Sequence, residues 1–154
     1  MATRCSITIK SVDGQVYRIY RHNDGAPEAV LSDLRILTQV YNRNPIEDPE
    51  YFLANFIFYA KLRLWKLYSS NNDLPFKPWE LGYGVCQPNC EHADLDYVYY
   101  IYPMDGKVRI HILERDGDAF KSLFDGNIRK AFEKWAKEEG CHITWSLFTG
   151  DKNE

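Results

Sequence analysis

The chain has 154 residues and a formal net charge of −3, which fits one ordinary domain, residues 1–154, able to bury its own core. The acidic balance excludes a general nucleic-acid binder, since such proteins gain affinity by neutralising phosphates. The most apolar stretch is too short to cross a bilayer, and the first residues show no apolar signal-peptide core. These features predict a soluble cytoplasmic protein with no membrane association.

The first half of the chain predicts a hairpin and two helices. Residues 4–10 alternate apolar and polar side chains, and Asp13-Gly14 supplies the turn into a second strand. A helix over 27–41 begins with a proline, and a second helix over 49–68 follows the capping residue Asp48. The second helix is apolar nearly all round in its first half, so we expect it to be the central element or half of a homodimer interface.

The second half predicts another hairpin, a long helix and a last strand. Its elements are, in order, a short strand or loop over 82–85, strands over 95–102 and 107–114 that turn at Asp105-Gly106, a helix over 118–139 and a strand over 141–148. Together the two halves predict an α+β fold. It has about five mostly antiparallel strands, from two Asp-Gly hairpins and a C-terminal strand, and three helices.

The same pattern of turn residues occurs in both halves of the chain. An Asp-Gly turn, a strand, a second Asp-Gly and an apolar helix start recur with the same spacing, ending at Leu31 in the first copy and at Leu123 in the second. Two explanations are open. Either the chain carries an internal ββα duplication, with pseudo-repeats over 4–41 and 95–139, or two unrelated hairpins use the same turn residues.

Three residues on the loop before the second hairpin form a candidate metal site. Cys86, Cys90 and His92 have ligand types and a spacing that resemble one half of a structural zinc site. The second Cys/His pair that usually completes such a site is missing. The fourth ligand would come from elsewhere in the fold, and there are four candidates: Asp94, His111, Cys141 and His142. The alternative is that these are two loop thiols and a solvent-exposed histidine.

His22 and Asp24 form a second candidate site, for a small ligand or for catalysis. They lie at the end of a predicted strand and just before a helix start. An imidazole oriented by a carboxylate is a general-base arrangement, and a nearby helix N-terminus favours anions. The alternative is that Asp24 only forms the turn, while His22 packs at the end of the strand.

The strand that opens the second hairpin is rich in tyrosine. Tyr97, Tyr99, Tyr100 and Tyr102 cover both faces of this strand by parity. They predict either cross-strand aromatic packing or an exposed aromatic platform for a base or a peptide, of which the acidic balance and the lack of interleaved Arg or Lys favour the peptide. The sequence also lacks a phosphate-cradling loop, a nucleophile elbow, a His-Glu-x-x-His motif and a dinucleotide-binding fingerprint, which favours a protein that is not an enzyme.

The N-terminal sequence resembles a group of short proteins from phages and prophages. The resemblance lies in residues 4–7, in Asp13-Gly14 and in residues 19–28, which read Ile-Tyr-Arg-His-Asn-Asp-Gly-Ala-Pro-Glu. Members of the group open with an Arg-Ser-x-Ile-like strand and carry a Tyr-x-His-Trp-Asp-Gly-Tyr-Pro stretch. Here Asn23 stands in place of the Trp and Ala26 in place of the second Tyr.

Residues 94–99 also resemble a later strand of those proteins, so the resemblance covers about a third of the chain. The group has no established activity, and the resemblance implies only a mobile-element product that acts inside a bacterial or archaeal cell. We therefore expect a small non-enzymatic binding protein that docks an aromatic surface on a host protein or on a second copy of itself. Inhibition of a host defence system is the role that the resemblance suggests.

Overall fold

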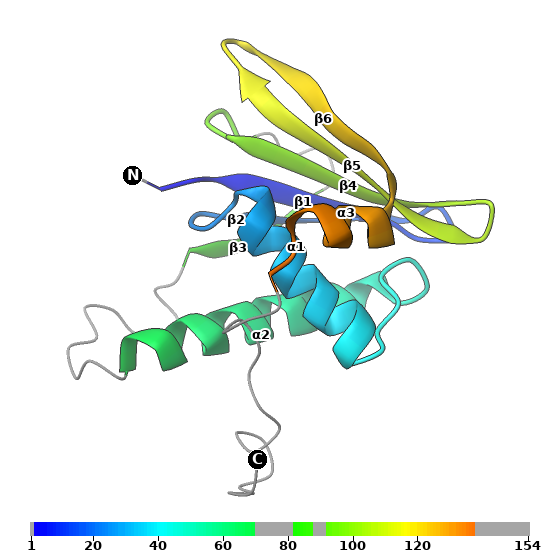
Figure 1. The fold of residues 1–154 in the computed structure, drawn as a ribbon, viewed down its shortest axis with the longest axis horizontal. Coiled ribbons are helices and arrows are strands. Elements are labelled where there is room, and N and C mark those ends of the chain that lie inside the picture. Colours follow the sequence, from blue (N-terminus) through cyan, green and yellow to red (C-terminus); the bar gives the residue numbers. More distant parts are fainter. Residues whose placement is uncertain (1, 70–81, 88–91, 138–154) are drawn as a thin grey trace, which may run out of the picture.

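A computed structural model describes residues 2–69, 82–87 and 92–137 of the chain. Figure 1 shows two layers, a twisted sheet and a layer of helices packed against one of its faces, so the predicted α+β class is confirmed. The strands are β1 (Cys5–Lys10), β2 (Val16–Arg21), β3 (Tyr83–Cys86), β4 (Tyr97–Met104), β5 (Lys107–Asp116) and β6 (Ala119–Asn127). The helices are α1 (Pro27–Arg35), which continues as the π-helical segment η1 (Ile36–Val40), α2 (Pro49–Ser69) and α3 (Ile128–Trp135). The strand predicted over 141–148 lies outside the described residues.

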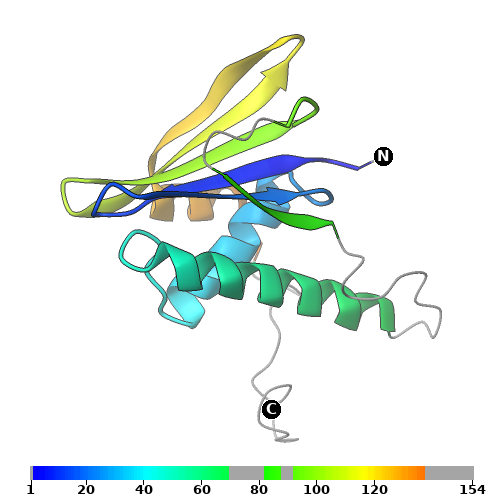
Figure 2. The same cartoon turned by 180° about the vertical axis from the view of Figure 1, so that it is seen from behind.

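The six strands form one mixed sheet in the order β3-β2-β1-β4-β5-β6. The two predicted Asp-Gly hairpins lie side by side in it, because β1 pairs with β4 in parallel while every other neighbouring pair is antiparallel. The hairpin turns contain Gly14 and Gly106, both with a positive φ. Figure 2 shows the same sheet from behind, with β3 along its edge above the long helix α2.

The helix predicted over 118–139 is wrong in its first half. Residues 119–127 form strand β6, and the helical part among the described residues is 128–135. Gly117, with a φ of 65°, makes a third hairpin turn that returns the chain along the exposed edge of β5. The two copies of the sequence echo therefore differ in element order after their second Asp-Gly: Leu31 lies in α1, whereas Leu123 lies in β6.

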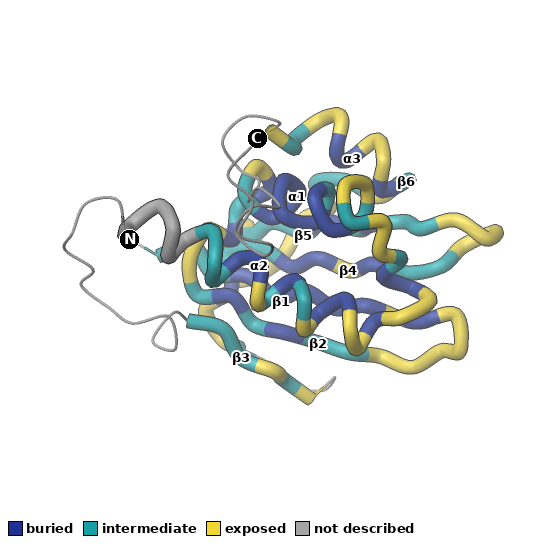
Figure 3. Tube along the Cα trace, turned by 90° about the horizontal axis from the view of Figure 1, so that it is seen from below, coloured by how far each residue is buried: buried dark blue, intermediate teal, exposed yellow. Residues whose placement is uncertain are grey.

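The core lies between the sheet and the helices. Every second residue of β1 faces the helices, and Cys5, Ile7 and Ile9 are all fully buried there. From the helix layer, Phe52 and Phe56 of α2 pack into the same cluster. Burial raises the pKa of the Cys5 thiol to about 12, so this residue stays protonated inside the core. Figure 3 shows the buried residues concentrated in the central strands and in the inner sides of the helices.

Over residues 49–63, where its side chains are described, helix α2 has a buried side and an exposed side, which differs from the expectation that it is the central element. It forms the outer edge of the helix layer, with Tyr51 66% and Phe58 56% exposed on its outer side. No helix within the described residues combines the length and the apolar character that crossing a bilayer requires.

Candidate functional site

A pocket in the described part of the chain lies where one end of the sheet meets the helices. Its volume is about 500 Å³. Three stretches that are distant in sequence meet there: the end of η1 with the loop toward α2, the β4–β5 turn, and the junction of β6 with α3. We call it the basic pocket, and its lining consists of Thr38, Gln39, Asn42, Arg43, Asn44, Pro45, Gly106, Lys107, Val108, Asn127, Ile128, Arg129 and Phe132.

The wall that comes from η1 has an unusual backbone. The amide of Tyr41 donates to the carbonyl of Ile36 at 3.0 Å, a five-residue span that widens the helix. The chain then leaves the helix through Asn42, whose φ of 53° is left-handed, and the amide of Arg43 donates to the carbonyl of Leu37 at 2.9 Å. This is the ordinary way to close a helix C-terminus. π-Helical turns occur often at functional sites, and this one brings Thr38 and Gln39 into the lining.

The opposite wall begins at Asn127, the N-cap residue of α3. Its Oδ1 accepts a hydrogen bond from the backbone amide of Arg129 at 2.9 Å. In the loop on the other wall, Oδ1 of Asn44 accepts from the backbone amide of Ile46 at 3.1 Å. Each amide side chain is thus held by its oxygen, which leaves its NH₂ group as a hydrogen-bond donor. Both walls therefore offer oriented donors.

The charge of the basic pocket is of one sign. Arg43, Lys107 and Arg129 line it, and the lining has no Asp or Glu among the described residues. Asp105 is next to the lining in the β4–β5 turn without being part of it. Within the described residues, the ion pairs are made by other cations, and none involves these three. A protein with a net charge of −3 thus gathers three cations around one pocket, which favours an anion there.

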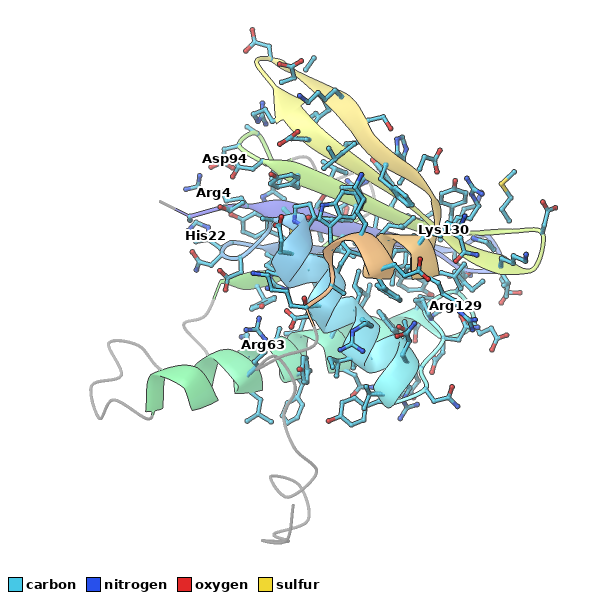
Figure 4. All side chains as sticks on the ribbon, viewed as in Figure 1. Arg4, His22, Arg63, Asp94, Arg129 and Lys130 are labelled. Carbon is cyan, nitrogen blue, oxygen red and sulfur yellow. The ribbon has the colours of Figure 1, made fainter. Side chains whose placement is uncertain are left out.

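The predicted His22/Asp24 pair lies elsewhere and is not brought together by a hydrogen bond. Nδ1 of His22 lies 2.7 Å from the hydroxyl of Tyr20 on the helix-free face of the sheet. Asp24 has a φ of 57° in an exposed turn and lines a different, smaller pocket of about 220 Å³ beside Arg63. Figure 4 shows His22 near Arg4 and Asp94 at one end of the sheet, with Arg129 at the other end.

Two of the three predicted metal ligands do come together. Sγ of Cys86 lies 3.1 Å from Nε2 of His92, and the ring of His92 stacks on Tyr20 with a centroid distance of 4.3 Å. The third residue, Cys90, lies outside the described residues, as do the candidate ligands Cys141 and His142. Within the described ranges, no group of three or more His, Cys, Asp or Glu side chains is arranged to hold a metal ion. A structural zinc site at Cys86, Cys90 and His92 stays a prediction.

The tyrosines of β4 divide between the two faces of the sheet, as the parity of the strand predicts. Tyr99 is fully buried on the helix side, where its hydroxyl donates to the carbonyl of Gly25 at 2.6 Å. Tyr100 and Tyr102 lie on the other face, and Tyr100 is 36% exposed. The hydroxyl of Tyr102 donates to Asp125 at 2.7 Å and accepts from Nε of Arg109 at 3.2 Å.

Comparisons with protein-family models, with curated proteins and with solved structures find no match to this chain.

The sequence reasoning missed the basic pocket. Its cations lie 22 to 86 positions apart in sequence and belong to no local motif, so only the fold brings Arg43, Lys107 and Arg129 to one place. One signal was present. Asparagines occur at a predicted helix end, in Asn42-Arg43-Asn44, and Asn127 is an amide residue of the type that caps a helix start. Helix ends are places where backbone and side chains both offer hydrogen-bonding groups.

Proposed function

We propose that the protein is a non-enzymatic binding protein that holds an anionic, phosphate-like ligand in the basic pocket. The observation that carries this proposal is the convergence of Arg43, Lys107 and Arg129 on a pocket without acidic lining in the described part of the chain. The free NH₂ groups of Asn44 and Asn127 add neutral donors. A lining dominated by donors suits a ligand rich in acceptor oxygens, and hydrogen bonds to a charged partner are the strongest kind.

The same lining argues for binding rather than for turnover. It contains no carboxylate, imidazole or thiol among the described residues, so Lys107 is the one described lining residue of a type that serves as a general acid or base. Thr38 is the only hydroxyl side chain in that described lining, and it donates to the carbonyl of Leu34 at 3.0 Å. No base among the described lining residues is placed to activate it as a nucleophile. Retention of an anion is the activity that these groups support.

The proposal predicts that single cation-to-alanine variants weaken anion binding. A charge-assisted hydrogen bond contributes roughly 1.5–3 kcal/mol, so Arg129→Ala or Lys107→Ala is expected to raise the Kd for inorganic pyrophosphate about 10- to 100-fold. Isothermal titration calorimetry at low ionic strength measures this change directly.

The matched control is Lys121→Ala. Lys121 is an exposed cation on β6 that pairs with Glu114 at 3.7 Å, outside the basic pocket. This variant is expected to bind pyrophosphate as the unchanged protein does. Added salt should weaken binding in all cases, because the pocket is open to solvent. Equal losses in Lys121→Ala and Arg129→Ala would mean that net charge, and not the pocket, attracts the anion.

A second candidate function is favoured by the helix-free face of the sheet. Tyr100 is exposed there, and Tyr102 is fixed between Arg109 and Asp125. Tyrosine and arginine are the residue types that dominate protein–protein hot spots. Lys10 and Arg18 project from β1 and β2 onto the same face, so the fitting partner is a protein with an acidic surface. A host protein, such as a component of a defence system, is the partner that the phage resemblance suggests.

This second candidate is tested by photo-crosslinking in bacterial cells. A benzophenone amino acid at position 100 should give one discrete protein adduct, and Arg109→Glu should abolish it by reversing the charge of the face. The same amino acid at Val12, which is 56% exposed in the β1–β2 turn, should give none. An adduct between two copies of the chain would assign the face to a homodimer. A nuclease-sensitive adduct would assign it to nucleic acid, and position-independent labelling would end the docking hypothesis.

A further inference from the structure

We infer that the ligand of the basic pocket is the phosphate ester of a sugar or polyol. This inference rests on the proposed function, that the pocket holds an anion, and it names the chemical class of the rest of the ligand. Three features of the lining carry it: the size of the pocket, the different chemistry of its two walls, and the burial of its aromatic residue.

The pocket is larger than an inorganic anion requires. Its volume of about 500 Å³ lies in the range of roughly 300–1,000 Å³ that is usual for organic ligands. A water molecule takes about 30 Å³ of the liquid, and a phosphate ion with five heavy atoms would fill only a minor part of the space. An organic group attached to the phosphate would occupy the remainder.

The two walls offer different hydrogen-bonding groups. The wall formed by the β4–β5 turn and α3 supplies donors, namely Lys107, Arg129 and the NH₂ of Asn127. The wall formed by η1 and the loop after it also carries donors, Arg43 and the NH₂ of Asn44, and it adds Gln39 and Asn42, whose amides both donate and accept. Gln39 and Asn42 are both exposed. A hydroxyl group also donates and accepts, so the cations suit a phosphate, and the amides of Gln39 and Asn42 suit a polyhydroxylated group.

The described lining offers no exposed aromatic ring on which a base could stack, and its two arginines are assigned to the phosphate. Its aromatic residue among the described positions, Phe132, is only 4% exposed and belongs to the hydrophobic core. Recognition of a nucleobase commonly uses an exposed aromatic ring or an arginine plane together with contacts to the base edge. A sugar or polyol phosphate needs no stacking surface, and this difference favours it over a nucleotide.

The test compares four probes by isothermal titration calorimetry on the full-length protein: inorganic phosphate, ribose 5-phosphate, ribose and adenosine 5′-monophosphate. The unchanged protein is expected to bind ribose 5-phosphate at least 10-fold more tightly than inorganic phosphate, and to bind ribose not measurably. Gln39→Leu is expected to reduce that preference to less than 3-fold. Because Gln39 is exposed, the Gln39→Leu protein should have the same thermal unfolding midpoint as the unchanged protein. This measurement checks that the variant folds.

Each other outcome has a definite meaning. Equal affinity for inorganic phosphate and ribose 5-phosphate would overturn this inference and leave the anion-binding function in place. A 10-fold preference for adenosine 5′-monophosphate over ribose 5-phosphate would overturn it in favour of a nucleotide. Binding of ribose as tight as that of ribose 5-phosphate, or no binding of any phosphate, would overturn the inference together with the proposed function.

Discussion

Replacing Asp33 with asparagine is expected to lower the free energy of unfolding by about 3–5 kcal/mol, the usual cost of removing one partner from a buried ion pair. Asp33 is fully buried in α1 and holds two arginines. Its carboxylate accepts from Nη1 of Arg21 at 2.8 Å and from Nε and Nη2 of Arg63 at 2.9 and 3.0 Å. The Arg21 guanidinium is also fully buried and lies 5.7 Å from the ring centroid of Phe56.

Asparagine keeps the shape of the side chain and removes its charge, so the variant leaves two cations in or near the core without a counter-charge. Urea unfolding measures the loss. The matched control is Asp94→Asn, because Asp94 pairs with Arg4 at 3.3 Å while its side chain is 62% exposed. Exposed pairs contribute at most about 1 kcal/mol. Equal costs for the two variants would show that the Asp33 network does not hold α1 and α2 against β2.

Replacing Gly25 with alanine is expected to cost about 1–3 kcal/mol or more, because the added methyl group would collide with backbone. A Cβ at this position would lie 2.8 Å from the carbonyl oxygen of Thr3 and 2.9 Å from the carbonyl carbon of Arg4. Neither atom can turn away as a flexible side chain would. The amide of Gly25 also donates to Thr3 at 2.9 Å, and its carbonyl accepts from Tyr99 at 2.6 Å, so any shift would weaken both bonds.

The control for this variant is Gly84→Ala on β3. There the nearest atom to an added methyl group is Cβ of Tyr20 at 3.9 Å, an ordinary contact. This substitution should therefore change the free energy of unfolding little, apart from the reduced freedom of the unfolded chain. Thermal or urea unfolding of both variants decides the point. If Gly25→Ala left the free energy of unfolding unchanged, the start of β1 and the turn before α1 would be packed less tightly than the structure shows.

Local signals were sufficient to predict most of the elements. The turn residues Asp13-Gly14 and Asp105-Gly106 located two hairpins, and the prolines at 27 and 49 located the starts of α1 and α2. These signals work because a positive φ or a fixed φ is a property of the residue itself. The order of the strands was not available from such signals, since it depends on the long-range pairing of β1 with β4.

Strand β6 was missed because its apolar residues follow a helical spacing. Phe120, Leu123 and Phe124 lie three and four positions apart, which is typical of one helix face. In the structure a register shift between Ile112 and Leu113 changes the pairing of β6 with β5, so strict alternation is lost. Pairing with the edge of β5 after the turn at Gly117 makes this segment a strand despite its helical spacing. Tertiary context often overrides a local pattern in this way.

The basic pocket depends on the same long-range contacts. Its three cations belong to a loop, to the first residue of β5 and to the first turn of α3, and each is an ordinary surface residue in its own segment. The predicted sites at His22 and at Cys86 consist of residues that are close together in the sequence. A local motif can indicate only sites of this kind.

An NMR titration with inorganic pyrophosphate, following the backbone amides of the labelled full-length protein, tests most directly whether the basic pocket binds an anion. The expected result is a set of saturable shifts confined to residues 38–45, 106–108 and 127–132, which need a higher pyrophosphate concentration in Arg129→Ala and are unchanged in Lys121→Ala. Shifts centred on His22 and Asp94 at the opposite end of the sheet, or small shifts scattered over every exposed lysine and arginine, would contradict it.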